Sequence, residues 1–248
     1  MRLSQPEPSG EPVHEIRVPT VAMLAAVAGL VVCASARAQS SCPRIEPVDV
    51  TSLLLPPPCD ACDITKAELA ELQTLQKSRT PDMVKHASDD YTRTVERFLA
   101  GMTPSIMVEN VGAADHLFAC ATETTEDAID AAKTKFNRTR PYRLPDNGLQ
   151  VLKTIPANDA PSFPSAHAAF GIVTGLILIA MAPELRERIS ARIKDFGLSR
   201  LISGVHYRSD VYAGEFAGAA IAASLFADRH FRAELEKVKP DLRKAIGH

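Results

Sequence analysis

The chain of 248 residues has no tryptophan, and aromatic residues make up only 5% of it. It therefore offers little material for a platform on which nucleic-acid bases stack. An excess of positive charge is also missing, because 28 Lys and Arg stand against 30 Asp and Glu, for a formal net charge of −2. A whole-chain attraction to nucleic acid needs such an excess, so no nucleic-acid partner is expected.

Long apolar runs are scarce as well. The stretch 168–182 is shorter than the ~20 residues that a membrane-spanning helix needs, and the stretch 211–227 is interrupted by Glu215. Strand-like alternation of apolar and polar residues is almost absent, whereas helical spacing recurs after residue 63, from Pro81 through Tyr91 to Phe98, and over 113–136. The sequence predicts an all-α fold, a single compact helical bundle built around a buried apolar helix.

The first 38 residues are typical of a secretory signal peptide. An apolar run from Val21 to Val32 follows Arg17, and Ala36 and Ala38 supply the small residues that signal peptidase prefers. The alternative is a retained membrane anchor, for which the run is short. We expect residues 1–38 to be removed and residues 39–248 to form the domain, in the periplasm or secreted and without stable membrane insertion.

Four cysteines remain after that cleavage: Cys42, Cys59, Cys62 and Cys120. An even number in an exported chain favours disulfides, for which three pairings are open. Cys59 and Cys62 have the spacing of a redox pair, but a stiff Pro56–Pro58 segment precedes them in place of a strand. A zinc site lacks a second Cys/His pair at ligand spacing, so structural bridges are the preferred interpretation.

Three short segments carry side chains that suit phosphate chemistry. Taken singly, each segment has a purely structural explanation: cations at a helix end, a serine N-cap, or an exposed histidine paired with an aspartate one turn away. Together they supply three cations, Lys133, Arg140 and Arg200, and a helix N-terminus at Ser165 and Ala166, whose amides are donors for an anion. These parts predict a phosphate-binding site.

Two histidines supply reactive groups. His206 and Asp210 are four residues apart, so on a helix they share a face, where the carboxylate would hold one ring nitrogen protonated and leave the other as a nucleophile. His167 is a separate imidazole that can protonate a leaving oxygen. No residue cluster calls for a metal, and no cofactor is expected.

The three segments resemble the signature K-x6-R-P, P-S-G-H, S-R-x5-H-x3-D of the type 2 phosphatidic acid phosphatase and vanadium haloperoxidase superfamily. The size, the signal peptide and the start at Leu55-Pro56-Pro57-Pro58 look like the class A bacterial non-specific acid phosphatases. The resemblance covers most of residues 39–248, although only the three segments are specific.

This resemblance implies an all-α, metal-independent acid phosphatase with an acidic optimum. It would hydrolyse a broad range of small organic phosphomonoesters through a phosphohistidine, often as a homo-oligomer. His206 would attack phosphorus, Asp210 would orient it, and His167 would be the general acid. The phosphate would be held by Lys133, Arg140, Arg200, the Ser165 hydroxyl and the amide of Ala166. Ala166 stands where the family usually has glycine. Alanine would be strained if that turn needs a positive φ, whereas a helical first turn accepts it, and we expect activity to survive.

Three other functions remain as alternatives. A membrane-associated lipid phosphatase would need more spanning segments, and vanadate-dependent haloperoxidases are generally much longer chains. A non-catalytic phosphate-binding module would not need His167, His206 and Asp210.

Overall fold

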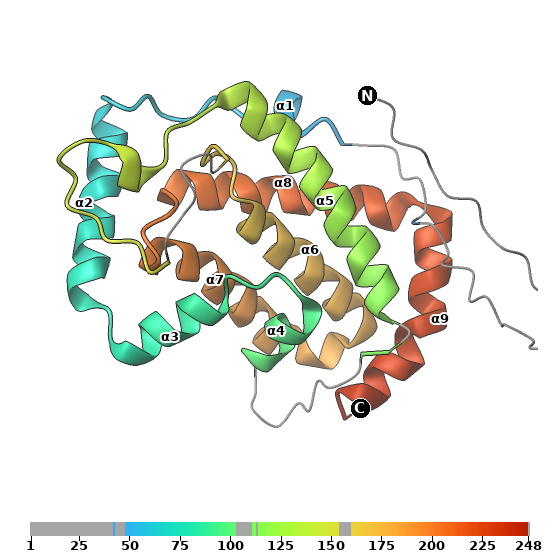
Figure 1. Cartoon of the computed structure of the whole chain (residues 1–248). Coiled ribbons are helices and arrows are strands. Elements are labelled where there is room, and N and C mark those ends of the chain that lie inside the picture. Colours follow the sequence, from blue (N-terminus) through green and yellow to red (C-terminus); the bar gives the residue numbers. More distant parts are fainter. Residues whose placement is uncertain (1–41, 43–47, 103–110, 113, 154–159, 248) are drawn as a thin grey trace, which may run out of the picture. The chain divides into compact units, whose positions relative to one another are not determined.

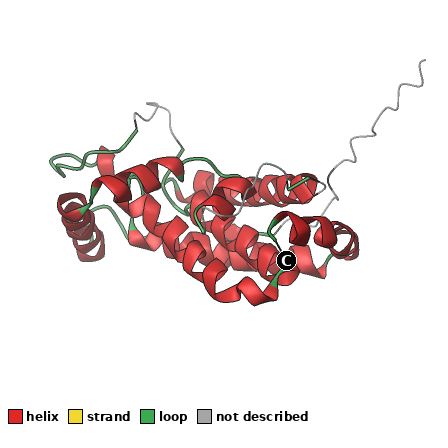
Figure 2. Ribbon diagram, turned by 90° about the horizontal axis from the view of Figure 1, so that it is seen from below, coloured by secondary structure: helices red, strands yellow, loops and turns green. Residues whose placement is uncertain are grey.

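The computed structural model describes residue 42 and residues 48–102, 111–112, 114–153 and 160–247. All regular elements within these ranges are helices (Figure 2), so the all-α prediction is confirmed. The proposed signal peptide and its cleavage site lie outside the described residues and stay a prediction. The described helices belong to one unit, Ser41–His248.

Nine α-helices and two short 3-10 turns follow one another along the described part of the chain. The α-helices are α1 (Val50–Leu53), α2 (Asp63–Ser78), α3 (Pro81–Asp89), α4 (Val95–Ala100), α5 (Ala114–Phe136), α6 (Ala166–Met181), α7 (Arg186–Ile202), α8 (Arg208–Ala227) and α9 (Arg229–Ala245). The 3-10 turns are η1 (Pro141–Arg143) and η2 (Pro183–Leu185).

Helix α6 is the apolar centre of the bundle, with α5, α7 and α8 packed around it (Figure 1). Apart from His167 and Thr174, its residues are apolar or glycine, and Phe170, Val173, Ile177 and Leu178 are almost completely buried. Burial of such side chains contributes about 1.5–3 kcal/mol each, so this helix makes a large contribution to the stability of the fold. Among the described residues, no helix combines the length and the hydropathy needed to cross a membrane.

Two glycines let α8 lie directly against the start of α6. A Cβ atom on Gly214 would overlap the main-chain oxygen of Ser165, and one on Gly218 would come within 2.6 Å of the main-chain oxygen of Ala169. The backbones of the two helices can therefore approach closely at the point where the predicted site residues begin.

The helical face predicted from Pro81 to Phe98 is divided into two helices, which corrects the sequence interpretation. Thr80 caps α3 through the amide of Met83, and Thr94 caps α4 through the amide of Arg97. The backbone of Thr94 is extended, with φ of −128° and ψ of 156°, as is usual for an N-cap residue, so one helix cannot run from Pro81 to Phe98. The turn between them, residues 90–94, carries Tyr91 out of the predicted helical face.

The four cysteines form two disulfides, Cys42–Cys120 and Cys59–Cys62. The first ties the N-terminal segment to α5, and the second closes the turn whose last residue, Cys62, is the N-cap of α2. The structure thus selects one of the three open pairings.

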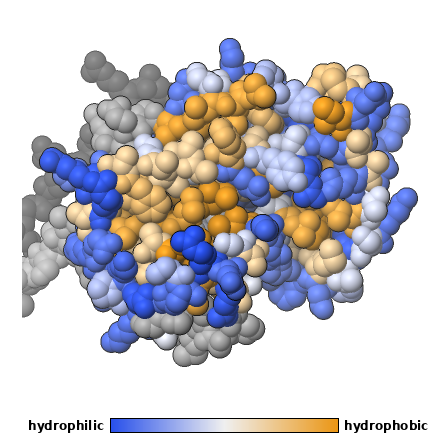
Figure 3. Space-filling view, turned by 180° about the vertical axis from the view of Figure 1, so that it is seen from behind, coloured by the Kyte–Doolittle hydropathy of each residue, from blue (hydrophilic) through white to orange (hydrophobic). Residues whose placement is uncertain are grey.

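Apolar side chains gather in several patches on the face opposite to that of Figure 1 (Figure 3). A groove between the 53–58 segment and α8 contains four of the five large hydrophobic side chains that are exposed in the described structure: Leu53, Leu55, Tyr212 and Phe216. The predicted homo-oligomer stays a prediction.

Candidate active site

The predicted site residues come together where several helices begin or end. Lys133 lies in the last turn of α5, Arg200 in the last turn of α7, and Asp210 in the first turn of α8. Ser165 is the N-cap of α6, and its main-chain amide donates to the main-chain oxygen of Asp210 over 2.9 Å. Segments far apart in the sequence therefore meet at a single site.

His206 is buried and held by groups on both sides of its ring. Its Nδ1 lies 3.3 Å from Oδ2 of Asp210, and its Nε2 lies 3.2 Å from Nη1 of Arg140. A proton on Nδ1 donated to the carboxylate leaves the lone pair on Nε2, where Arg140 donates to it. Burial, followed by the charges of Arg140, Lys133 and Arg200, keeps the pKa of His206 well below 6.5. The imidazole is therefore neutral and suited to act as a nucleophile.

The route by which Asp210 reaches His206 differs from the predicted one. The two residues do not share a helical face, because α8 begins at Arg208 and His206 precedes it. Asp210 instead turns back over the start of its helix, where its Oδ2 also accepts the amide hydrogen of Tyr207 over 2.9 Å. Asp210 thus contacts His206 as part of a helix cap, in which a carboxylate of the first turn binds residues that precede the helix.

Arg138 is a buried partner of Asp210 that the sequence interpretation passed over. Helix α5 ends at Phe136, and the next residue, Asn137, is left-handed with a φ of 45°, a conformation that asparagine tolerates better than most residues. Nη1 of Arg138 then donates to Oδ1 of Asp210 over 2.7 Å, and Nη2 donates to Oε2 of Glu68 over 3.1 Å. Burial raises the pKa of Asp210, and Arg138 acts against that rise.

Glu68 connects helix α2 to this network. Its Oε1 accepts the amide hydrogen of Ser209 over 2.6 Å, and its Oε2 accepts the hydroxyl hydrogen of the same residue over 3.0 Å. The only sequence signal for Arg138 was its place between Lys133 and Arg140, and no local pattern marked Glu68, which is 70 residues away from Arg138.

Main-chain oxygens hold two of the three predicted cations. Lys133 donates from Nζ to Pro161 over 2.5 Å, and Arg140 donates from Nε to Ala160 over 2.9 Å and from Nη1 to Val205 over 2.9 Å. Both side chains are buried, so their charge acts in a region of low dielectric constant.

Arg200 is the third cation, and only 3% of it is exposed. Its Nε and Nη1 are buried and have no hydrogen-bond partner among the described residues. Burial lowers the pKa of Arg200 to about 10, against the raising effect of Tyr91 and Asp90, so the guanidinium stays charged at neutral pH. Buried donors of this kind favour an anionic ligand, because an unsatisfied buried donor costs about 1–3 kcal/mol.

Ser165 and Ala166 form the helix N-terminus that the sequence predicted. Ser165 is fully buried, and its hydroxyl oxygen accepts the amide hydrogen of Ala168 over 3.4 Å. Ala166 is the first residue of α6, and positive φ angles at non-glycine residues occur in the described structure only at Asn137 and Asp146. Alanine is therefore unstrained at this position.

His167, in the first turn of α6, lies between aromatic rings. Its ring is stacked on Phe196, with centroids 6.1 Å apart, and meets Tyr91 edge-on at 6.4 Å. Its Nε2 lies 3.2 Å from the main-chain oxygen of Tyr91, to which it donates. Burial, followed by the charges of Arg200 and Arg93, places the pKa of His167 well below 6.5.

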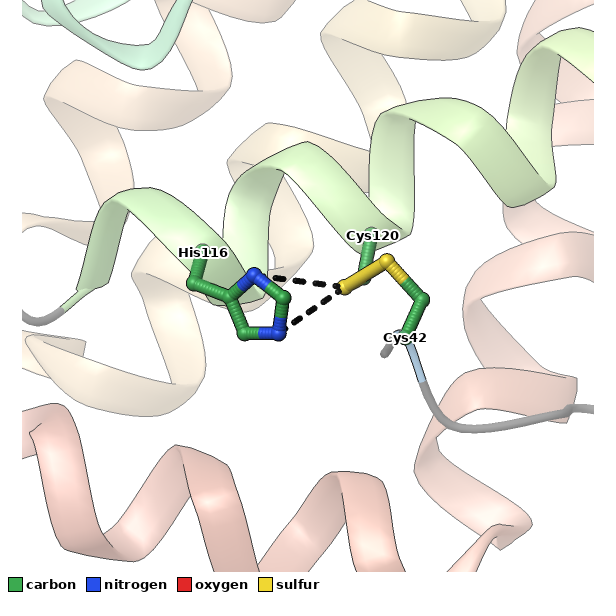
Figure 4. A group of neighbouring side chains, drawn as sticks. All are labelled: Cys42, His116 and Cys120. Carbon is green, nitrogen blue, oxygen red and sulfur yellow. Dashed lines mark hydrogen bonds between the residues drawn. A yellow bond between two sulfur atoms is a disulfide. The ribbon is translucent and has the colours of Figure 1, made fainter. Parts of the chain in front are cut away.

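Two clusters of metal-ligand atoms occur among the described residues. In one of them, His116 points at the bridge between Cys42 and Cys120, with its Nε2 3.6 Å from Sγ of Cys120 (Figure 4). Because the two sulfur atoms are bonded to each other, they are not the thiolates that a metal ion takes as ligands.

The other cluster consists of His86, Asp90 and Asp195. Arg192 donates to both of its carboxylates, over 2.6 and 2.9 Å to Asp90 and over 2.9 Å to Asp195. A guanidinium already neutralises these carboxylates and would repel a metal cation, so the cluster is an ion-pair network.

Comparison with known proteins agrees with this geometry. Residues 114–234 match the PAP2 superfamily, and this segment contains all eight predicted site residues. The chain is 34% identical over 126 residues to an acid phosphatase of Zymomonas mobilis, over 50% of this chain and 48% of that protein. It is 36% identical over 118 residues to a non-specific acid phosphatase of Salmonella typhimurium, over 46% of each chain.

A solved structure shares the fold. A bacterial vanadium-dependent iodoperoxidase aligns with a TM-score of 0.53 at 14% identity, covering 70% of this chain and 51% of that one. Residues 114–234 thus carry a PAP2 superfamily domain, as the three sequence segments predicted. The chain spans about half the length of the curated relatives that it matches.

Proposed function

We propose that the protein is an exported acid phosphatase that hydrolyses small phosphomonoesters through a phosphohistidine on His206, without a metal ion. The observation that carries this proposal is the position of His206. Asp210 binds Nδ1, and Nε2 faces Arg140 within a group of three cations. The names of the acid phosphatases that it resembles support the same reaction.

The first step transfers the phosphoryl group to the enzyme. The lone pair on Nε2 of His206 forms the bond to phosphorus while the bond from phosphorus to the ester oxygen breaks. His167 gives its proton to the departing alcohol, and Lys133, Arg140 and Arg200 stabilise the charge on the equatorial oxygens.

The second step regenerates the enzyme. His167, now neutral, takes a proton from water, whose oxygen attacks phosphorus and breaks the bond to Nε2. Inorganic phosphate leaves, and His167 again holds the proton that the next cycle requires.

The pKa values of the two histidines favour an acidic optimum. His206 must be neutral to attack, and its depressed pKa keeps it neutral in mildly acidic solution. His167 must carry a proton to act as the acid, and its depressed pKa makes that form more abundant as the pH falls. A bound phosphate dianion favours the same protonation, because the opposite charge stabilises an imidazolium.

The roles of the two histidines can be separated with leaving groups of different basicity. An alkyl leaving group needs a proton, whereas nitrophenolate leaves well without one, and general-acid help is worth typically 100- to 10,000-fold. His167→Ala should therefore lose much more activity on an alkyl phosphate than on nitrophenyl phosphate in single-turnover measurements. His206→Ala should abolish turnover of both and prevent trapping of a phosphoenzyme. A phosphoenzyme that still forms in His206→Ala but not in His167→Ala would reverse the assignment.

Export is supported by the apolar run from Val21 to Val32 and by the pairing of all four remaining cysteines into disulfides. The protein recovered from the periplasm or the medium should begin after Ala38 and contain almost no free thiol when denatured without reductant. A full-length chain in the membrane fraction, or two or more free thiols, would argue against this part of the proposal.

A further inference from the structure

The turn between α3 and α4 lies beside the proposed active site and is anchored by a buried carboxylate. Asp90 is fully buried, and its oxygens accept from Nη2 of Arg192 over 2.6 Å, Nε of Arg97 over 2.8 Å and the hydroxyl of Ser199 over 2.7 Å. Ser199 directly precedes Arg200, so the bond to Ser199 fixes the turn to the part of α7 that carries this cation.

Tyr91, the next residue in this turn, contacts two site residues. Its main-chain oxygen accepts a hydrogen bond from Nε2 of His167, and its ring centroid lies 4.3 Å from Cζ of Arg200. Nζ of Lys153 lies 4.5 Å from the same centroid. Cation–π contacts of this kind hold a ring in place, so the phenol has a defined position next to the phosphate-binding cation.

The phenolic hydroxyl of Tyr91 is buried and has no hydrogen-bond partner with normal geometry among the described residues, as is true of Nε and Nη1 of Arg200. The phenol oxygen still lies close enough to the guanidinium to raise the pKa of Arg200 through a side-chain hydrogen bond, so the hydrogen of the phenol is left to donate elsewhere. Buried donors of two residues in contact are thus available to one ligand. A phosphate group can accept from several donors at once, and each unsatisfied buried donor costs about 1–3 kcal/mol without a partner. One bound anion would satisfy the phenol and the guanidinium together.

We propose that Tyr91 is a further substrate-positioning residue, whose hydroxyl donates a hydrogen bond to an oxygen of the bound phosphate beside Arg200. This inference rests on the proposed function, because it takes the same anion as ligand. Tyr91 and Asp90 precede the segment that matches the PAP2 superfamily, so neither is among the residues that this match covers.

Tyr91→Phe tests the proposal, since it removes the hydroxyl and keeps the ring, the turn and the main-chain bond to His167. We expect the affinity for inorganic phosphate and for vanadate, measured by calorimetry, to fall roughly 10- to 100-fold, the range for a hydrogen bond to a charged group. The melting temperature without ligand should not fall. Tyr212→Phe is the matched control, because Tyr212 is 59% exposed and lies outside the site. Equal phosphate affinity in Tyr91→Phe and the unmodified protein would overturn the proposal.

The same substitution in an Arg200→Lys protein distinguishes a direct hydrogen bond from Tyr91 to phosphate from an indirect effect of Tyr91 on Arg200. If the hydroxyl binds phosphate itself, Tyr91→Phe should weaken phosphate binding by a similar factor in an Arg200→Lys protein. If Tyr91 only orients the guanidinium, the second substitution should add nothing, and the proposal would be wrong.

The calorimetric measurement also keeps this inference apart from the proposed function. A protein that binds phosphate through Tyr91 but hydrolyses no phosphomonoester would contradict only the catalytic proposal. A protein that hydrolyses phosphomonoesters as expected, with unchanged phosphate affinity in Tyr91→Phe, would contradict only the role of Tyr91.

Discussion

Arg138→Gln removes the buried guanidinium that links Asp210 to helix α2. The Arg138 side chain is 1% exposed, and it forms ion pairs of 2.7 Å with Asp210 and 3.1 Å with Glu68. Without it, two carboxylates in the interior lose their cation. Breaking a buried pair from one side costs about 3–5 kcal/mol, which is a large part of the 5–15 kcal/mol by which a typical domain is stable. For a chain of this size, the melting temperature should fall by roughly 6–20 °C.

The same substitution should change the pH dependence of activity. Burial already raises the pKa of Asp210, and Arg138 is the largest of the groups that lower it, so that pKa should rise further in Arg138→Gln. A protonated Asp210 no longer holds the proton on Nδ1 of His206. Activity should therefore be lost at a higher pH on the acidic side of the profile. At the optimum we expect a loss of roughly 10- to 100-fold, as for groups that orient a metal-bound imidazole.

The assay compares profiles of kcat/KM against pH at a temperature where circular dichroism shows each variant to be folded. Arg208→Gln is the control, because Arg208 also joins α8 to α2, through an ion pair with Glu71, but is about one third exposed. Exposed pairs contribute at most about 1 kcal/mol, so this control should keep both its stability and its pH profile. A folded Arg138→Gln protein with the unmodified acidic limb and kcat/KM would refute the reasoning.

Three other outcomes are expected. Hydrolysis should continue in excess EDTA and be blocked by vanadate, which mimics five-coordinate phosphorus; loss in EDTA that a divalent ion restores would contradict the metal-independent mechanism. Gly214→Ala should lower both activity and melting temperature, because its Cβ would overlap the Ser165 oxygen, whereas Gly171→Ala meets nothing closer than 3.6 Å and should be neutral or stabilising; equal effects would exclude the proposed close approach. The free energy of unfolding should fall as the pH drops below about 6.5, because His167 and His206 bind protons more readily in the unfolded chain. In denaturant titrations, His206→Gln should make the free energy of unfolding depend less steeply on pH. An unchanged pH dependence would show that His206 is not held neutral.

Much of the candidate site was predictable because its side chains lie in three short segments with fixed spacing. Lys133, Arg140 and His206 lie in such segments, and the structure brings them together. The all-α class followed from helical spacing and from the lack of strand-like alternation. The long apolar helix was predicted as a core element because it is too short to span a membrane.

The parts that escaped prediction depend on contacts between distant segments. Glu68 and Arg138 meet only after α2 has folded against the start of α8, and no local pattern encodes that meeting. In the sequence, Asp90 is one acidic residue within a continuous helical pattern. In the structure it directly follows the end of α3 and binds Arg192, 102 residues further along the chain. The apolar residues keep a helical spacing through Tyr91, but spacing shows only which residues are apolar. It does not show that a second helix begins at the N-cap Thr94.

The site combines two requirements that oppose each other. Lys133, Arg140 and Arg200 are buried close to His206, where their charges lower the pKa of the imidazole and keep its lone pair available. Grouped cations repel one another in a region of low dielectric constant, so this arrangement costs stability in the absence of an anion. Main-chain oxygens at residues 160, 161 and 205 reduce that cost for Lys133 and Arg140. Two donors of Arg200 have no partner among the described residues, so an anion gains most by binding there, next to His206.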